Sequence, residues 1–139
     1  STYRELFVPL IKQQVNLVHK YGAIYDFYDD GKCMDVIGML RECEIDALQT
    51  LTPPPYGDLG LARAKEEIGD AVCLSGYIDA PNVIRKETPD NIEKEVRRAI
   101  EIAAPGGGFI LGASDDIARE TPLENVRAYF RAGRKYGRY

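Results

Sequence analysis

Three polar residues at alternate positions, Asp26, Tyr28 and Asp30, could perform acid–base chemistry. In an extended strand this spacing directs all three side chains to the same side. A carboxylate that is buried there needs a partner or a raised pKa, because desolvation disfavours its charged form. The residues could therefore line a pocket as acid–base or cation-binding groups. Alternatively, backbone groups or an arginine satisfy Asp26, while Asp29 and Asp30 form a turn and a helix N-cap.

Two later loops contain further candidate site residues. Gly76-Tyr77-Ile78-Asp79 supplies a phenol and a carboxylate, and Ser114-Asp115-Asp116 supplies a hydroxyl and two carboxylates. Asp79 could instead cap the turn at residues 81–84, and residues 114–116 could be ordinary polar loop residues. We expect catalytic roles for Tyr28, Asp30 and Asp79, and substrate contacts for Asp26, Tyr77, Ser114 and Asp115.

The elements that must position these residues alternate regularly. Apolar stretches typical of strands lie at residues 23–28, 45–51, 71–75 and 109–111, and helical patterns lie at residues 33–43 and 58–68 and after Thr88-Pro89 and Thr121-Pro122. Short apolar strands that are each followed by a helix favour a parallel sheet covered by helices. Ligands bind at the carboxyl ends of such strands, so we expect the polar loops to converge there.

Two helix boundaries have specific signals. The first helix is expected to begin near Pro9, because proline suits the first helical turn, and to end at Gly22. The last helix is expected to begin with a capping box, Thr121-Pro122-Leu123-Glu124, and to bury Leu123, Val126 and Phe130.

Composition excludes several classes of protein. The 139 residues include 18 Lys and Arg against 22 Asp and Glu, a net charge of −4, so no basic field is available for nucleic acid or anionic lipid. Apolar runs are too short to span a bilayer, and no leader pattern is present, so we expect a cytoplasmic protein. Three cysteines without a C-x-x-C pair and a single histidine exclude a disulfide scaffold and a zinc finger.

Several motifs in order resemble the carboxyl-terminal half of the uroporphyrinogen decarboxylase superfamily. The most specific are A-P-G-G-G-F-I-L at residues 104–111 and T-P-L-E-N-V at residues 121–126. The resemblance covers the whole chain and implies half of a TIM (β/α)8 barrel, with four parallel βα units preceded by a helix in one domain over residues 1–139. A complete barrel needs roughly 250 residues, which agrees with the short length of this chain.

The resemblance implies one of two activities. Members of the superfamily remove carboxyl groups from a tetrapyrrole without a cofactor, or transfer methyl groups between corrinoid proteins, methylated substrates and thiols. Zinc-dependent methyltransferases of the superfamily carry H-x-C-G where this sequence has Tyr28-Asp29-Asp30-Gly31, and a later cysteine near Ala113-Ser114. The resemblance therefore does not carry a thiolate zinc site to this chain. A corrinoid, or a divalent metal held by oxygen ligands, remains an expectation for the complete enzyme.

Charge distinguishes the two activities. A substrate with many carboxylates favours an electropositive pocket, whereas the loops that follow the strands are rich in aspartate. We therefore expect a small-molecule enzyme of this superfamily that catalyses decarboxylation or corrinoid-linked methyl transfer, in the latter case with a corrinoid protein as partner. The alternative is a non-catalytic half barrel. In either case the unpaired strand edges predict a homo-oligomer.

Overall fold

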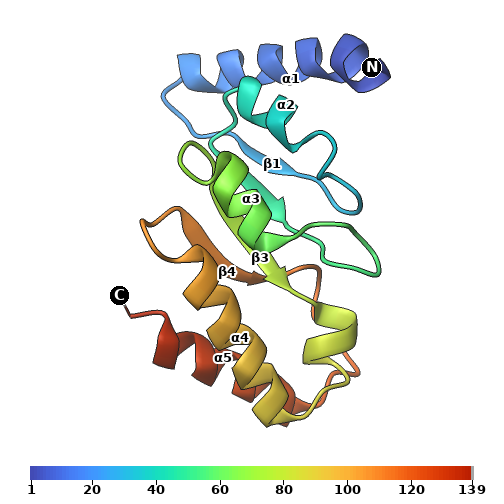
Figure 1. The fold of residues 1–139 in the computed structure, drawn as a ribbon, viewed down its shortest axis with the longest axis vertical. Coiled ribbons are helices and arrows are strands. Elements are labelled where there is room, and N and C mark those ends of the chain that lie inside the picture. The colour runs from blue at the N-terminus through green and yellow to red at the C-terminus, as the bar shows by residue number, and fades with distance from the viewer. Residues whose placement is uncertain (139) are drawn as a thin grey trace.

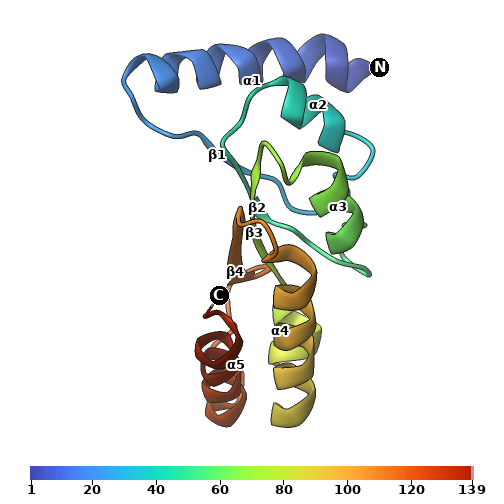
Figure 2. The same ribbon diagram turned by 60° about the vertical axis from the view of Figure 1, so that its left-hand side comes forward.

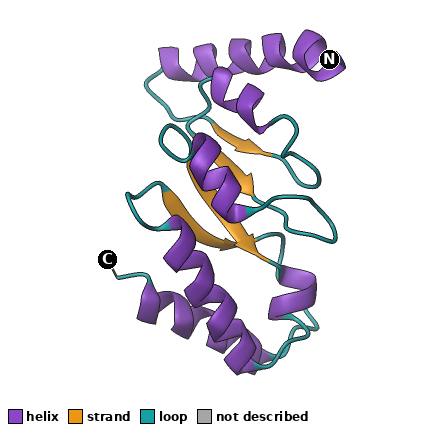
Figure 3. Ribbon diagram, in the orientation of Figure 1, coloured by secondary structure: helices purple, strands orange, loops and turns teal. Residues whose placement is uncertain are grey.

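The computed structural model describes residues 1–138, which contain a four-stranded parallel sheet with the strands in sequential order (Figures 1 and 3). The strands are β1 (Asp26–Tyr28), β2 (Ala47–Thr50), β3 (Cys73–Ile78) and β4 (Phe109–Ala113). All three neighbouring pairs are parallel. This arrangement confirms the α/β class and the four parallel βα units expected from the sequence.

Helices connect the strands and extend the chain at both ends. They are α1 (Thr2–Lys20), α2 (Ile37–Glu42), α3 (Leu61–Ile68), the short π-helix η1 (Ala80–Ile84), α4 (Pro89–Ala103) and α5 (Leu123–Tyr136). Figure 2 shows α2, α3 and α4 on the same side of the sheet, with α5 beside α4. Within residues 1–138, none of the helices combines the length and apolarity required to cross a membrane.

The two faces of the sheet have different environments. One row of paired residues, Phe27, Leu48, Leu74 and Phe109, packs into the core, and Leu48 and Leu74 are fully buried. The next row, Tyr28, Gln49, Ser75 and Ile110, points to the opposite face, because side chains alternate along a strand. Tyr28 and Ile110 are each more than half exposed. The second face is therefore open, although parallel sheets are usually covered on both faces.

Helix α4 agrees with its sequence pattern. Thr88 is the N-cap, and its hydroxyl oxygen accepts a hydrogen bond of 3.3 Å from the backbone N–H of Asn91. The apolar residues at helical spacing are all buried: Ile92, Val96, Ala99, Ile100 and Ala103. The N-cap and the apolar spacing both predict this helix, and its packing in the folded protein agrees with them.

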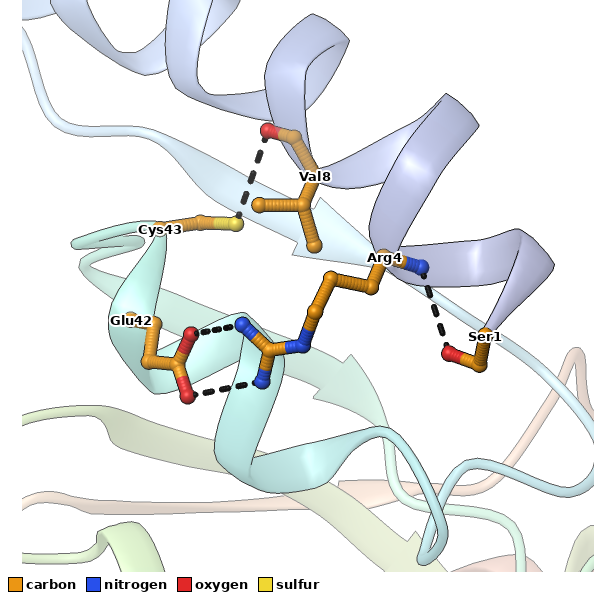
Figure 4. Close-up of polar contacts among 5 residues, drawn as sticks. All are labelled: Ser1, Arg4, Val8, Glu42 and Cys43. Atoms are coloured by element: carbon orange, nitrogen blue, oxygen red, sulfur yellow. Dashed lines mark hydrogen bonds and ion pairs between the residues drawn. The ribbon is translucent and has the colours of Figure 1, made fainter.

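Helix α1 begins at Thr2, so the expected start near Pro9 is wrong. Ser1 caps the helix, and Arg4 forms a bidentate ion pair with Glu42 at 2.6 and 3.0 Å, which connects α1 to α2 (Figure 4). The Cys43 thiol also donates to the Val8 carbonyl oxygen at 3.8 Å. Pro9 lies on the exposed side of the helix, where water can satisfy the carbonyl group that proline leaves without a donor.

Helix α5 begins at Leu123, and the expected capping box is absent. Pro122 is the N-cap without a side-chain hydrogen bond, because the chain turns one residue earlier, where Thr121 N–H donates to the Ala118 carbonyl oxygen. The expected buried stripe is also wrong, since Leu123 and Phe130 are exposed. The buried residues of α5 are Asn125, Ala128, Tyr129 and Ala132.

Asn125 replaces the missing cap as the anchor of this helix. Its side chain is 3% exposed, and its amide nitrogen donates to the carbonyl oxygens of Ile84 and Glu87 at 3.0 and 2.8 Å. These bonds join α5 to the segment that follows η1. A buried amide with two good acceptors fixes this junction, because breaking either bond would leave a buried polar group unsatisfied.

Two other helices begin later than the sequence predicts. Instead of helices at residues 33–43 and 58–68, the structure has α2 at Ile37–Glu42 and α3 at Leu61–Ile68. The cause is Asp58, whose carboxylate accepts hydrogen bonds from the backbone N–H groups of Cys33 and Met34 at 2.9 and 3.2 Å. Asp58 thus holds the segment before α2 in a turn and is itself outside α3.

Gly76 and Gly38 provide a matched pair for testing the contact between β2 and β3. Gly76 has φ of +123°, and a Cβ there would lie 2.4 Å from the Thr50 carbonyl oxygen, whereas a Cβ at Gly38 in α2 would meet nothing within 4 Å. We predict that Gly76→Ala lowers the free energy of unfolding by more than about 2 kcal/mol. Gly38→Ala should raise it by roughly 0.5 kcal/mol. Urea unfolding measures both free energies. Equal changes in the two variants would contradict the close contact between Gly76 and the Thr50 carbonyl oxygen.

The pair between His19 and Asp46 predicts a pH dependence. The Asp46 carboxylate accepts from Tyr25 N–H at 2.6 Å and contacts His19 Nε2 at 2.7 Å, and these two partners, in that order, lower the pKa of Asp46. A lowered folded-state pKa adds stability that is present above the unfolded-state pKa and is lost as pH falls through the folded-state value. Asp46→Asn should therefore make the free energy of unfolding less dependent on pH below about pH 4. The expected difference is roughly 0.5 kcal/mol, because the pair is partly exposed.

Thermal unfolding between pH 2.5 and pH 6 measures this effect. Asp35→Asn is the control, because Asp35 is exposed and forms no ion pair within residues 1–138. An identical slope in the Asp46→Asn variant and in the unmodified protein would contradict the assignment.

Candidate functional site

A cavity of about 370 Å³ lies at the carboxyl ends of the strands, and all four strand-following segments contribute to it. The lining residues are Asp30, Gly31, Thr52, Tyr56, Pro81, Ser114 and Asp115. Three of the residues singled out in the sequence, Asp30, Ser114 and Asp115, thus lie together, although Asp30 is more than 80 positions from the other two in the chain. The name rim cavity is used below for this site.

Glycine permits the close approach that forms one wall of the rim cavity. A Cβ at Gly57 would lie 2.1 Å from the Thr52 carbonyl oxygen and 2.5 Å from the Gly31 carbonyl oxygen. Only glycine allows the proline-rich loop at residues 53–57 to lie this close to the loop after β1. The contact places Thr52 and Tyr56 beside Asp30.

Thr52 has the least satisfied polar group of the rim cavity. The residue is 8% exposed, and its hydroxyl oxygen has no hydrogen-bond partner within residues 1–138. Buried hydroxyl groups almost always have a partner, since an unpaired one costs roughly 1–3 kcal/mol. The hydroxyl oxygen of Thr121, which lines neither this cavity nor its neighbour on the open face, is likewise buried and unpaired within residues 1–138, so the feature is not specific to the rim cavity.

Left-handed backbone conformations occur where β2 and β3 approach this site. Thr50, Leu51 and Tyr77 have φ of 82°, 51° and 92° although none is glycine. Thr50 is held by its hydroxyl group, which donates to the Asp29 carbonyl oxygen at 2.6 Å. Backbone strain of this kind persists only where surrounding contacts enforce it, and it is concentrated at functional sites.

A second cavity of about 490 Å³ lies on the open face of the sheet, next to the rim cavity. Its lining includes Tyr28, Gln49, Ser75, Asp115 and Asp116, and Asp115 belongs to both cavities. Burial raises the pKa of Tyr28, and the charges of Asp115, Asp30 and Asp116 add to the effect. The phenol therefore stays protonated at neutral pH and can donate a hydrogen bond.

Asp26 is exposed and lines neither cavity. It shares a sheet face with Tyr28, as the alternation predicts, but that face is uncovered at this position. Its position supports neither the acid–base role nor the alternative of a buried carboxylate satisfied by an arginine.

Tyr77 and Asp79 lie apart from the rim cavity, in a smaller cavity of about 160 Å³ that Pro53, Val83 and Glu95 also line. Asp79 is 8% exposed, and its two carboxylate oxygens accept from the backbone N–H and the side-chain amide of Asn82 at 2.8 and 2.9 Å. Asp79 is thus the N-cap of η1, which was the alternative role open to it in the sequence. Burial is the main cause of a raised pKa at Tyr77.

Ser114 and Asp115 have local partners within the rim cavity. Ser114 is 3% exposed, and its hydroxyl oxygen accepts from Ala80 N–H at 3.3 Å, which leaves the hydroxyl hydrogen free to donate. The Asp115 carboxylate is exposed and accepts from the backbone N–H of Asp116 at 2.7 Å. Ser114 thereby ties the start of η1 to the end of β4.

Negative charge dominates the electrostatics of this end of the sheet. Asp29, Asp30, Asp115 and Asp116 form no ion pair within residues 1–138, and no lysine or arginine lines either cavity. Burial raises the pKa of Asp29, and the neighbouring charges of Asp30 and Asp58 raise it further. The site therefore favours positive over negative ligands.

A thiolate metal centre does not fit the residues at this site. No group of three histidine, cysteine, aspartate or glutamate side chains within residues 1–138 could hold a metal ion. The cysteine nearest in sequence to the rim cavity, Cys33, is fully buried, and burial raises the pKa of its thiol to about 12. The two candidate residues at the end of β1, Tyr28 and Asp30, supply a phenol and a carboxylate in place of the imidazole and thiolate that such a centre needs.

Comparison with known proteins places this arrangement in a family. A family model described as uroporphyrinogen decarboxylase (URO-D) matches residues 1–136. The chain belongs to the uroporphyrinogen decarboxylase family. A solved structure described as a methyltransferase from Methanosarcina mazei superposes with a TM-score of 0.79 at 21% identity, covering 98% of this chain and 37% of that one. This likeness shows the fold, a section of a TIM-type barrel.

Curated relatives carry two kinds of name. A uroporphyrinogen decarboxylase of Methylobacillus flagellatus is 32% identical over 53% of this chain and 20% of its own length. A methylated-thiol–coenzyme M methyltransferase of Methanosarcina mazei is 25% identical over 95% of this chain and 32% of its own. A methylcobamide:CoM methyltransferase of Methanosarcina barkeri is 31% identical over 76% and 29%. The chain thus spans about a third or less of the length of these relatives.

The sequence places Thr52 among the polar residues that follow the second strand, but it predicts neither Thr52 nor Tyr56 as a site residue. Both follow β2, so their position after an apolar strand was an available signal. The long-range contact of Gly57 with the loop after β1 decides their placement, and sequence spacing does not show it.

Thr52→Val tests whether the buried hydroxyl group is unpaired in the folded protein. Valine has nearly the same shape and removes the unpaired oxygen, so we predict that the free energy of unfolding stays constant or rises by about 1 kcal/mol. Urea unfolding measures the change. A loss above about 1 kcal/mol would show that the hydroxyl group has a stabilising partner in the folded protein and would contradict its description as unpaired.

Proposed function

We propose that this chain forms the last four βα units of a family enzyme that transfers methyl groups in conjunction with a corrinoid protein. The observation that carries the proposal is the acidic rim cavity, whose lining includes Asp30 and Asp115 and no basic residue. Tetrapyrrole decarboxylation is the second activity of the family. The names of the relatives permit both activities, and the charge of the cavity favours methyl transfer.

The argument against decarboxylation is electrostatic. A tetrapyrrole substrate with several carboxylates would bring like charges close to Asp30, Asp115 and Asp116 in a partly enclosed site, where repulsion is weakly screened. Arginine or lysine would have to neutralise those charges, and neither lines the rim cavity or the cavity on the open face. A neutral thiol or a methylated small molecule carries no such penalty.

The residues present support specific roles in methyl transfer. A bound corrinoid would supply the methyl group. When a thiol takes up a methyl group on sulfur, its proton leaves, and the exposed carboxylate of Asp30 is placed to accept that proton at the cavity mouth. Tyr28 stays protonated and can orient the acceptor by donating a hydrogen bond. Ser114 and Asp115 would contact the small molecule, and Asp79 caps η1, whose Pro81 borders the cavity.

Self-association without catalysis is a second candidate, because apolar surface remains uncovered. Both edge strands, β1 and β4, are unpaired on their outer sides within residues 1–138. Large apolar residues are exposed along the two outermost helices, namely Leu6, Phe7, Leu10 and Leu17 on α1 and Leu123 and Phe130 on α5. Exposed edges and patches of this kind favour association with further polypeptide, including a second copy of this chain.

Methyl transfer can be tested with methylcobalamin and a small thiol. If the reading frame extends upstream of Ser1, the extended protein is used. We predict a loss of the visible absorption of methylcobalamin that depends on both protein and thiol, and at least a tenfold lower kcat for Asp30→Asn. Asp35→Asn, outside both cavities, should match the unmodified protein.

Two results would contradict the proposal, and a third would contradict only the role of Asp30. Release of carbon dioxide from uroporphyrinogen, without methyl transfer, would assign the decarboxylase activity. A folded oligomer that is inactive in both assays would favour the non-catalytic half barrel. Equal rates for Asp30→Asn and Asp35→Asn would leave methyl transfer in place but remove Asp30 from the reaction.

A further inference from the structure

Asp30 depends on the backbone around it for its position. Its side chain is exposed and forms no ion pair within residues 1–138. It lies in the segment between β1 and α2, residues 29–36, which is neither helix nor strand and is called the Asp30 loop below. The contacts that hold this loop therefore decide where the carboxylate lies at the rim cavity.

The end of β2 and the segment after it hold the Asp30 loop, and the two segments lie side by side at the carboxyl end of the sheet (Figure 1). The Thr50 hydroxyl group donates to the Asp29 carbonyl oxygen at 2.6 Å. Gly57 packs against the Gly31 carbonyl oxygen, which a Cβ at residue 57 would approach to 2.5 Å. Asp30 lies between these two contacts in the chain, so both restrain its backbone.

Asp58 makes the third contact with the Asp30 loop. One of its carboxylate oxygens, Oδ1, accepts from the backbone N–H groups of both Cys33 and Met34, at 2.9 and 3.2 Å. Cys33 and Met34 are buried, and a buried N–H group without an acceptor is costly. Loss of the Asp58 acceptor therefore favours a shift of the loop that exposes these groups to water.

Asp58 has no direct access to the site. It lines neither the rim cavity nor the cavity on the open face. Any effect that it has on the reaction must therefore pass through the Asp30 loop, whose Asp30 and Gly31 line the rim cavity.

We infer that Asp58 is a positioning residue for the proposed methyl transfer. Its hydrogen bonds to Cys33 and Met34 hold the Asp30 carboxylate where it accepts the proton of the thiol. The inference rests on the proposed function, because that function gives Asp30 its role. The acceptor oxygen of Asp58 carries the effect, and its negative charge is not required.

Two substitutions separate the acceptor oxygen from the charge, in the methylcobalamin and thiol assay with the protein described above. Asp58→Ala removes the oxygen, and kcat should fall by about fivefold or more, because small displacements of a catalytic group are costly. Asp58→Asn keeps an oxygen that can accept from both N–H groups, and its kcat should stay within about threefold of that of the unmodified protein. Asp35→Ala, at an exposed aspartate of the same loop, is the matched control and should leave kcat unchanged.

Combination with Asp30→Asn distinguishes positioning from a general structural role. If Asp58 acts through Asp30, Asp58→Ala should lower kcat by less than about twofold in the Asp30→Asn background. A general structural role would lower kcat by the same factor in both backgrounds. That result would overturn the inference, as would equal losses in Asp58→Ala and Asp58→Asn.

Amide hydrogen exchange measured by NMR follows the loop without relying on activity. The Cys33 and Met34 amides should exchange slowly in the unmodified protein and in Asp58→Asn, and about tenfold faster or more in Asp58→Ala. The amide signals of Asp30 and Gly31 should shift in Asp58→Ala. Unchanged exchange and unchanged signals in that variant would overturn the inference.

Thr50→Val is a second variant in case Asp58→Ala does not fold. It removes the other side-chain hydrogen bond to the loop, at the Asp29 carbonyl oxygen, and valine has nearly the shape of threonine. We expect the same shift of the Asp30 amide, and a fall in kcat that is again absent in the Asp30→Asn background. An unshifted Asp30 amide together with unchanged kcat would overturn the inference.

The inference and the proposed function fail separately. Faster amide exchange in Asp58→Ala, in a protein without any methyl transfer, would support the placement of the loop and contradict the function. Methyl transfer that Asp58→Ala leaves unchanged would support the function and overturn the role of Asp58.

Discussion

Burial of one apolar row across the sheet sets the direction of every other side chain on the strands. Phe27, Leu48, Leu74 and Phe109 are paired in register and face the helices. Because side chains alternate, the adjacent row must face the open side, and because all four strands are parallel, the loops after them must meet at one end. A one-residue shift of register would move the core row to the solvent.

This arrangement explains how residues from distant parts of the chain form one acidic cavity. Close backbone contacts at Gly57 and Gly76 bring the ends of β1, β2 and β3 together, and Ser114 ties β4 to η1. Within the described residues no lysine or arginine lines this site or forms an ion pair with its carboxylates, and the proposal of methyl transfer rests on this charge. The uncovered sheet face and the exposed apolar residues of α1 and α5 are a separate property, which concerns association.

The sequence predicts local structure best where neighbouring residues decide it. Helix α4 follows directly from Thr88 and its apolar spacing, and the parallel strand order follows from the alternation of elements. Pro9 and Thr121 predict the wrong starts for α1 and α5. Tertiary contacts of α1 outweigh the local preference of Pro9, and the turn before α5 outweighs that of Thr121. Asp30, Ser114 and Asp115 could be anticipated from strand ends, whereas the placement of Thr52 depends on a long-range contact.

The convergence of the four loops can be measured directly by paramagnetic relaxation enhancement. A spin label is attached at Asp30→Cys in a variant whose three native cysteines, Cys33, Cys43 and Cys73, are replaced. The structure predicts much faster relaxation of the Thr52 and Asp115 amides, which share a cavity with residue 30, than of the Gly108 amide, which precedes β4 at its opposite end. Faster relaxation at Gly108 than at Asp115 would show that the strands do not run in parallel and would contradict the site.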